Sequence, residues 1–235
     1  MRSFVTFLLA CTLLIAMVGC GDRGSNETAS GGIDRPLVIG VSIPSADHGW
    51  TGGVVWWAEE AMAMYPNVKW VYAQAKGPDE QVSQIENMMA QHKLDGMVVL
   101  AHESGPLTPV AEKVSEREIY LVNVDRGFLK PVADIFIEGD NVAFGRKSAE
   151  FIVEKLNGKG NIVVLQGIPS TVDTARVEAA QEVFDRYPDI KILAQQPGYW
   201  NQDRAYRVMT DILADPQLAA KIDAVWAQDD DMALG

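Results

Sequence analysis

Cysteine is scarce in this sequence, with two among 235 residues, at positions 11 and 20. Two cysteines cannot build the dense disulfide framework of a small secreted scaffold. If a leader that contains Cys11 is removed and Cys20 carries a lipid, the mature chain has no free thiol and no disulfide. The stability of the mature chain must therefore come from a hydrophobic core, which its 48% apolar residues can supply.

Positive charge is also in short supply. Twenty Lys and Arg stand against 32 Asp and Glu, which gives a formal net charge of −12. Binding to phosphate backbones independently of base sequence requires the opposite sign. Nucleic acid is therefore not an expected partner.

Long apolar runs are confined to the N-terminus. Residues 4–18 form an almost unbroken apolar run behind Arg2, and this run is shorter than the ~20 residues that a membrane-spanning helix needs. A basic start, a short apolar core and small residues at the end are typical of a signal peptide. The last four residues, Met17-Val18-Gly19-Cys20, resemble a bacterial lipobox, in which the cysteine carries the lipid. An ordinary secretory signal with an incidental cysteine is the alternative.

The next segment, residues 21–36, is rich in Gly and Ser and contains almost nothing to bury. Such a chain is a flexible coil and suits a tether between a lipid anchor and a folded domain. We therefore predict a lipoprotein signal at 1–20, a tether at 21–36, and a folded part in the periplasm or on the outer face of the cell membrane, anchored through Cys20.

Motifs of common enzymes are missing. The chain has no Gly-x-Ser-x-Gly elbow, no P-loop and no Gly-x-Gly-x-x-Gly after its first strand-like segment. Its three histidines have no partner cysteines at zinc spacing. Asp47 and His48 could form a hydrolytic pair, but no activated nucleophile accompanies them. We expect neither an enzyme nor a bound cofactor or metal.

The remainder alternates between strand-like and helix-like segments. The first strand-like run is 37–43, and an amphipathic helix pattern follows at 51–64. The repetition of such units predicts parallel sheets covered on both faces. The units form two blocks, which predicts two doubly wound α/β lobes at 37–138 and 139–235, with a candidate hinge at 138–141. The second block has three strands and ends one turn into a helix, so we expect an incomplete second lobe in a longer protein.

Five short sequence motifs follow one another along the chain. They are Asn123-Val124-Asp125-Arg126, Gly139-Asp140-Asn141 with Gly145, Val164-Leu165-Gln166-Gly167-Ile168 with Arg176, Gln195-Gln196-Pro197 with Trp200, and the segment 227–235 (AQDDDMALG). Together they resemble the ribose-binding type of periplasmic sugar-binding proteins of ABC transporters, over roughly residues 37–235. The resemblance implies a two-lobed fold that closes on a ligand by hinge motion.

Residues that suit a sugar follow several of the predicted strands. Carboxylates and guanidinium groups form charge-assisted hydrogen bonds with hydroxyls, and aromatic rings cover C–H faces. Ligands of doubly wound sheets bind at the carboxyl ends of strands. From this and the resemblance, the candidate ligand-binding residues are Asp47, His48, Trp50, Asp125, Arg126, Arg176, Trp200 and Asp229.

The sequence departs from the ribose-binding pattern at three positions. The family often has Asn where Asp229 stands and possibly where Asp47 stands, and His48 has no obvious counterpart. Ribose itself is therefore doubtful, and another pentose, a hexose, a linear polyol or a cationic ligand stays open.

Simpler roles also remain open for these residues. Asp125 and Arg126 could form a surface ion pair, and Arg176 could pair with Glu178 or Asp173 at the surface. His48 could cap the helix that begins near Thr51, and the acids at 229–231 could do the same for the last helix. Of the other tryptophans, we expect Trp70 and Trp226 in the core, and one of Trp56 and Trp57 in the core with the other partly exposed.

The resemblance implies a monomeric solute-binding protein of an ABC importer, which captures a small sugar or polyol and delivers it to a membrane permease. The alternative is a sugar-sensing binding protein that feeds a chemoreceptor or a sensor kinase. A sugar-responsive repressor shares the fold, but a signal peptide and tether occupy the place where its helix-turn-helix would stand.

Overall fold

The computed structural model describes residues 35–235, which form one compact unit from Arg35 to Gly235. The predicted signal at 1–20, including Cys20, and nearly all of the predicted tether lie outside the described residues. Within the described part of the chain, no helix is both long and apolar enough to cross a membrane.

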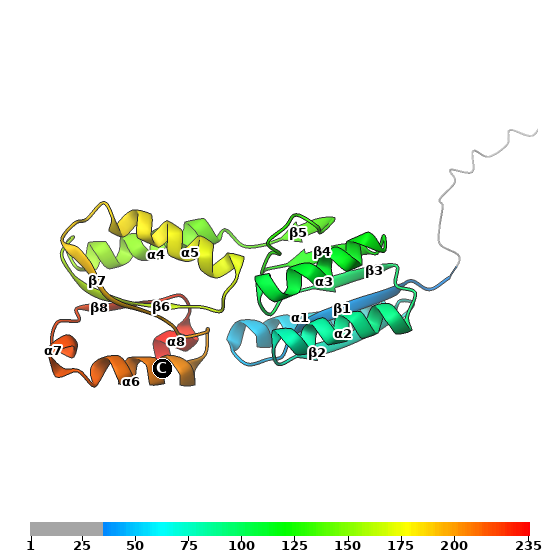
Figure 1. The fold of residues 1–235 in the computed structure, drawn as a ribbon, viewed down its shortest axis with the longest axis horizontal. Coiled ribbons are helices and arrows are strands. Elements are labelled where there is room, and N and C mark those ends of the chain that lie inside the picture. The colour runs from blue at the N-terminus through cyan, green and yellow to red at the C-terminus, as the bar shows by residue number, and fades with distance from the viewer. Residues whose placement is uncertain (1–34) are drawn as a thin grey trace, which may run out of the picture. The chain divides into compact units, whose positions relative to one another are not determined.

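The first half of the unit is a five-stranded parallel sheet (Figure 1). Its strands lie in the order β2-β1-β3-β4-β5. The order reverses at β1, and the loops that follow β1 and β3 therefore flank the point where doubly wound sheets bind their ligands. The strands are β1 (Val38–Pro44), β2 (Lys69–Ala75), β3 (Gly96–Val99), β4 (Tyr120–Val124) and β5 (Ile135–Ile137).

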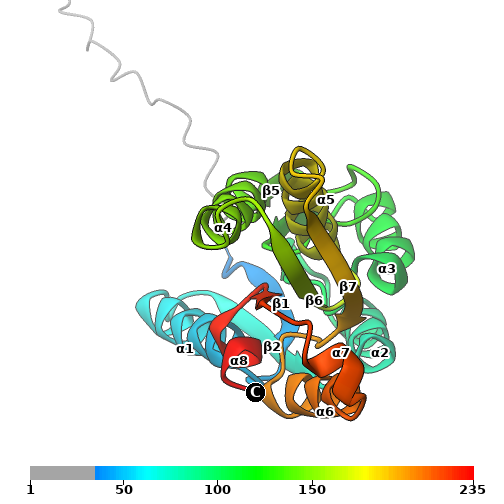
Figure 2. The same ribbon diagram turned by 90° about the vertical axis from the view of Figure 1, so that its left-hand side faces the viewer.

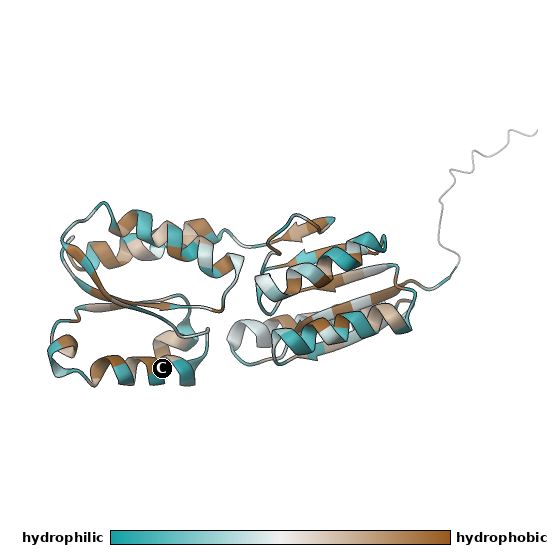
Figure 3. Ribbon diagram, in the orientation of Figure 1, coloured by the Kyte–Doolittle hydropathy of each residue, from teal (hydrophilic) through white to brown (hydrophobic). Residues whose placement is uncertain are grey.

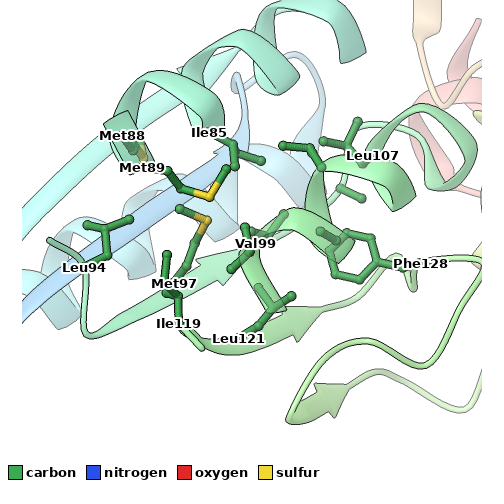
Figure 4. Close-up of a cluster of buried hydrophobic side chains, with 14 residues drawn as sticks. Ile85, Met88, Met89, Leu94, Met97, Val99, Leu107, Ile119, Leu121 and Phe128 are labelled. Atoms are coloured by element: carbon green, nitrogen blue, oxygen red, sulfur yellow. The ribbon is translucent and has the colours of Figure 1, made fainter. Parts of the chain in front are cut away.

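Alternation along the strands divides the core of this half into two clusters, because successive side chains point to opposite faces. Val41 and Ile43 of β1 face α1 (Gly49–Met64), together with Leu100. Met97 and Val99 of β3 face the other side, against α2 (Pro78–Gln91) and α3 (Ser104–Glu116). Figure 4 shows this second cluster, in which Ile85, Met89, Leu107 and Phe128 surround the strand residues.

The second half contains a three-stranded parallel sheet in the order β7-β6-β8. Figure 2 shows α4 and α5 on one side of β6 and β7, with α6 and α8 on the other. Hydrophobic residues run along the strands of both sheets and alternate with polar ones on the covering helices (Figure 3). The elements are α4 (Asn141–Lys155), β6 (Gly160–Gln166), α5 (Thr171–Phe184), β7 (Ile190–Pro197), α6 (Gln202–Leu213), α7 (Pro216–Ala219), β8 (Ala224–Ala227) and α8 (Asp230–Leu234).

Residues Glu138–Asp140 connect β5 to α4 and so join the two sheets. Asp140 accepts a hydrogen bond from the N–H of Ala143 and caps α4. Further along α4, a Cβ at Gly145 would lie 2.2 Å from the carbonyl oxygen of Arg176, so α4 and α5 touch backbone to backbone there. The predicted class, two doubly wound α/β lobes, is confirmed, whereas the hinge role of this stretch stays a prediction.

Several local predictions need correction. Trp56 and Trp57 are both exposed, at 52% and 62%, so the prediction that one of them lies in the core was wrong. The helix α1 turns Val54, Val55, Ala58 and Met62 toward the sheet, which leaves both tryptophans on the outside in an edge-to-face contact. Trp226 is buried as predicted, while Trp70 is half-buried. The short helix α7 was not predicted.

Candidate functional site

A cavity of about 160 Å³ lies where the loops of the two sheets meet. Seven of the eight candidate residues line it, while Asp47 lines a neighbouring cavity of about 230 Å³. The lining is His48, Trp50, Asp125, Arg126, Gly139, Asn141, Val172, Arg176, Trp200 and Asp229. Because no candidate is distant from this region, the structure brings the predicted set together in space.

Arg126 is the most deeply buried charge of the cavity wall, with 1% of its surface exposed. Its Nη1 donates to the backbone oxygen of His102 at 2.9 Å and, more weakly, to that of Ala101 at 3.4 Å. Its Nε lies 3.9 Å from Oδ2 of Asp125 and has no hydrogen-bond partner. Burial lowers the pKa of Arg126, although it stays charged. The alternative of a surface ion pair is therefore ruled out.

Residues with strained backbone conformations lie at or next to this cavity. Among the described residues, five non-glycine residues have positive φ, and two of them, Glu118 and Asn157, directly follow helix ends, where a left-handed residue is common. The other three are Asp125, Tyr199 and Trp200, with φ of 63°, 59° and 52°. Such conformations cost on the order of 1–3 kcal/mol each and persist mainly at functional sites.

Arg176 reaches the cavity from the second turn of α5. Its Nε donates to Oδ1 of Asn141 at 3.0 Å, and its Nη1 donates to the backbone oxygen of Gln228 at 3.0 Å. Its guanidinium group stacks over the ring of Phe144 at 4.2 Å, and burial lowers its pKa. Asp173, offered as a surface partner, instead accepts hydrogen bonds from Gly167 and Gln228.

Gly139, Asn141 and Val172 line the cavity although the sequence did not single them out as ligand contacts, and of these Asn141 has a polar side chain. Its side chain also donates to the backbone oxygen of Gly139, so it links the connection between the sheets to Arg176. The sequence feature that could have identified Asn141 was its side-chain amide within the predicted hinge stretch.

The two tryptophans of the cavity differ. Trp200 is 4% exposed, and its ring presses on Gly167, where a Cβ would come within 2.1 Å of a ring carbon. Trp50 is 60% exposed, and its Nε1 donates to Oδ2 of Asp125 at 3.2 Å. Trp200 therefore forms a fixed wall, whereas Trp50 lies at the rim.

Asp229 and His48 each cap a helix and also line the cavity. Asp229 accepts from the N–H of Met232 at 2.9 Å at the start of α8, and burial together with the neighbouring Asp231 and Asp230 raises its pKa to about 6. The Nδ1 of His48 accepts from the N–H of Thr51 at 3.4 Å at the start of α1. A ring nitrogen of His48 and carboxylate oxygens of Asp229 and Asp231 lie within 4.8 Å of one another, which makes these the described residues best placed to hold a metal ion.

Asp47 turns away from the cavity that its neighbour lines. Its Oδ1 accepts from the hydroxyl of Thr51 at 2.9 Å, so it belongs to the cap of α1. A direct contact between Asp47 and a ligand in the 160 Å³ cavity is therefore not supported by this arrangement.

A family model described as "Periplasmic binding protein domain" matches residues 39–235. The chain belongs to this family. The match covers both sheets and every residue that lines the cavity.

Curated relatives within the periplasmic binding proteins include a xylitol-binding protein of Mycolicibacterium smegmatis. It is 29% identical over 96% of this chain and 62% of its own length. The D-allose-binding periplasmic protein of Escherichia coli is 28% identical over 75% of this chain and 59% of its own length. The chain thus spans about three fifths of the length of these relatives.

Solved structures agree on the fold. An ABC transporter solute binding protein from Bacillus halodurans C-125 with bound myo-inositol superposes with a TM-score of 0.77 at 25% identity, over 86% of this chain and 70% of that one. A galactofuranose binding protein gives the same TM-score at 23% identity, over 85% of this chain and 69% of that one.

Proposed function

We propose that this protein captures a small, neutral sugar or polyol in the cavity between its two sheets. The observation that carries the proposal is the pairing of two guanidinium groups, of Arg126 and Arg176, with two carboxylates, of Asp125 and Asp229, beside the indole of Trp200. Opposite charges in equal number suit a ligand without net charge, and each forms strong hydrogen bonds with hydroxyls. Arg126 covers the Trp200 ring at 4.8 Å, so the exposed indole of Trp50 at the rim is the aromatic surface that suits the C–H groups of a sugar or polyol.

The cavity volume limits the size of the ligand. At about 160 Å³ it is smaller than the roughly 300–1,000 Å³ of pockets for drug-sized molecules. A monosaccharide or polyol of five or six carbons is therefore proposed, rather than an oligosaccharide. The relatives named for xylitol, D-allose and myo-inositol support this class.

The protein acts by binding, and we propose that the ligand leaves unchanged. The two sheets close around the ligand by hinge motion at residues 138–141, and a permease of an ABC importer receives the ligand from the closed form. The names of the relatives, which describe binding proteins, support this role. We further propose that the protein works as a monomer, held by a lipid on Cys20 outside the cytoplasmic membrane.

The class of ligand is tested by thermal unfolding of the whole protein against xylitol, D-allose, D-ribose, myo-inositol, amino acids, nucleosides and cationic amines. A ligand at 100 times its Kd adds about 2.7 kcal/mol to the free energy of unfolding, which raises Tm clearly. We expect a rise with one or a few sugars or polyols, and their recovery unchanged by chromatography. A rise with a nucleoside or an amine alone would contradict the proposed ligand.

The anchor is tested by the variant Cys20→Ser. We expect wild-type protein in the membrane fraction and the variant in the soluble fraction of the expressing cells. Retention of the variant on membranes would contradict lipidation at Cys20.

A further inference from the structure

His48 carries a buried polar atom without a partner. Its side chain is 4% exposed, and its Nε2 has no hydrogen bond in the described residues, with Oδ1 of Asp47 at 3.7 Å. A buried, unsatisfied N–H costs about 1–3 kcal/mol, so the position calls for a partner. Because His48 lines the ligand cavity, that partner can come from the ligand.

The helix cap decides which ring nitrogen of His48 bears the proton. Nδ1 accepts the N–H of Thr51, and the hydroxyl of Thr51 accepts the N–H of His48 in return, which completes a capping box. In a neutral imidazole one nitrogen accepts and the other donates, so Nε2 is the donor. Burial lowers the pKa of His48, and Arg126 lowers it further, against the opposing effect of Asp47, Asp231 and Asp125. The ring is therefore neutral at pH 7.

The other half of the subsite comes from the second sheet. Asp229 precedes α8, and one of its carboxylate oxygens lies within 4.8 Å of one of the two ring nitrogens of His48. Because Nδ1 is occupied by the N–H of Thr51, Nε2 is the nitrogen assigned to the ligand side. An oxygen about 2.9 Å from a ring nitrogen and about 2.7 Å from a carboxylate oxygen holds these two atoms about 4.6 Å apart at a tetrahedral angle. The backbone N–H of Gly49 donates to Oδ2 of Asp231 at 3.0 Å, which holds the starts of α1 and α8 together at this spacing.

We propose that His48 and Asp229 together bind a single free hydroxyl of the ligand, with Nε2–H of His48 donating to its oxygen and Asp229 accepting its hydrogen. This rests on the proposed function. A hydroxyl is the group that satisfies both partners, because it donates and accepts at once. A methyl ether cannot donate to Asp229, an ammonium group cannot accept from His48, and a deoxy carbon does neither.

The same geometry argues against a metal ion at these residues. A metal would need a lone pair on the ring nitrogen that faces Asp229 and Asp231. While α1 stays capped, Nδ1 is occupied by Thr51 and Nε2 bears hydrogen, so neither nitrogen is free. A metal would have to displace the cap of α1.

The test uses two variants that keep the helix caps. Ser is among the best N-cap residues, and Asn caps a helix as well as Asp does. His48→Ser and Asp229→Asn should therefore leave Tm within a few degrees of wild type while they remove the donor and the charged acceptor. Titration calorimetry of the whole protein first identifies the tightest binder among xylitol, D-allose, D-ribose and myo-inositol. That parent is then compared with each of its monodeoxy and mono-O-methyl derivatives.

Wild type should lose at least about 30-fold in affinity for the derivative altered at one position, and His48→Ser should lose about 10-fold for the parent. His48→Ser should then prefer the parent to that derivative by only about 3-fold, because Asp229 still accepts from the hydroxyl of the parent. The double variant should lose less than the product of the two single losses, because both act on one hydroxyl.

Three results would overturn the proposal. If His48→Ser binds the parent as wild type does, or rejects the same derivative as strongly as wild type does, His48 does not contact that hydroxyl, although the proposed function stands. If wild type binds Zn²⁺ and His48→Ser does not, the residues form a metal site. If no member of the panel binds, the proposed function fails, and this subsite fails with it.

Discussion

The two walls of the cavity each present an arginine, and they hold it by different means. The wall from the five-stranded sheet fixes Arg126 with backbone carbonyls of residues 101 and 102, in the loop after β3. The wall from the three-stranded sheet fixes Arg176 with one side-chain oxygen of Asn141, at the connection between the sheets, and one carbonyl of Gln228. Arg126 is almost fully buried, whereas Arg176 is partly buried.

This difference separates a rigid from an adjustable half of the site. The two carbonyls lie in the short loop between β3 and α3, which is held at both ends, so Arg126 is preorganised before a ligand arrives. The position of Arg176 depends on a side chain in the connecting stretch, where hinge motion would change backbone angles. The first wall is therefore expected to bind the ligand first, and the second to complete the hydrogen bonds on closure.

The largest effect should come from the rigid wall. Arg126→Ala removes a buried guanidinium group, leaves a void, and leaves the carboxylate of Asp125 without its neighbouring positive charge. We expect about a 1,000-fold loss of affinity by calorimetry and a fall of several degrees in Tm. Arg146→Ala, an exposed position on α4, is the matched control and should change neither. Unchanged affinity of Arg126→Ala would show that this wall does not touch the ligand.

The adjustable wall should respond differently to the same change. Arg176→Ala removes two hydrogen bonds from a partly solvated group, so we expect about a 100-fold loss of affinity with little change in Tm. The contrast between the two variants lies in Tm as well as in affinity. An equal fall in Tm for both would mean that Arg176 is as much a part of the fold as Arg126, and would contradict the distinction between the walls.

Much of this arrangement follows from local sequence. Runs such as Val38–Ile43 and Ile162–Leu165 are β-branched and apolar because they are buried on both faces, and their order with the helices predicts parallel sheets. Asp125, Arg126 and Asp229 could be placed at the site because each follows a strand. What lies at a carboxyl end of a parallel strand is predictable, since the topology brings those ends together.

Other features depend on packing that no local pattern reveals. The hydrogen bond from Arg176 to Asn141 requires α4 and α5 to approach each other closely at Gly145. This approach is a contact between residues that are far apart in the sequence. Asp47 lines a different cavity from His48 because its carboxylate is held by Thr51 in the cap of α1. The exposure of both Trp56 and Trp57 depends on the width of the face that α1 packs on the sheet, which includes Val54, Val55, Ala58 and Met62 but neither indole.

A smaller effect should reveal how the adjustable wall is positioned. Asn141→Ala removes the oxygen that holds Nε of Arg176, so we expect about a 10-fold loss of affinity. In the Arg176→Ala background the same change should cost little, because its target is gone. A loss of similar size in both backgrounds would show that Asn141 acts on the ligand directly and does not position Arg176.

The smallest expected effect is a pH dependence that belongs to one wall. Burial and neighbouring acids raise the pKa of Asp229 to about 6, so the ligand-free fold favours its protonated form. The corresponding stability is present below the ordinary pKa of Asp and is lost as pH rises through about 6. Ligand binding has the opposite sign, because the ionised carboxylate is the stronger acceptor for a hydroxyl. Affinity for a neutral sugar should therefore rise by a few-fold between pH 5 and pH 7.

The variant Asp229→Asn isolates this effect. Asn keeps the cap of α8 and an acceptor oxygen but does not titrate, so its affinity should change less than that of wild type across the same range. Arg126 and Arg176 remain charged across this pH range and do not contribute to the change of affinity with pH. Calorimetry at pH 5, 6 and 7 in buffers of matched ionic strength gives both curves. If the curve of Asp229→Asn rises as steeply as that of wild type, the titrating group lies elsewhere, and His48 on the rigid wall is then the group to vary next.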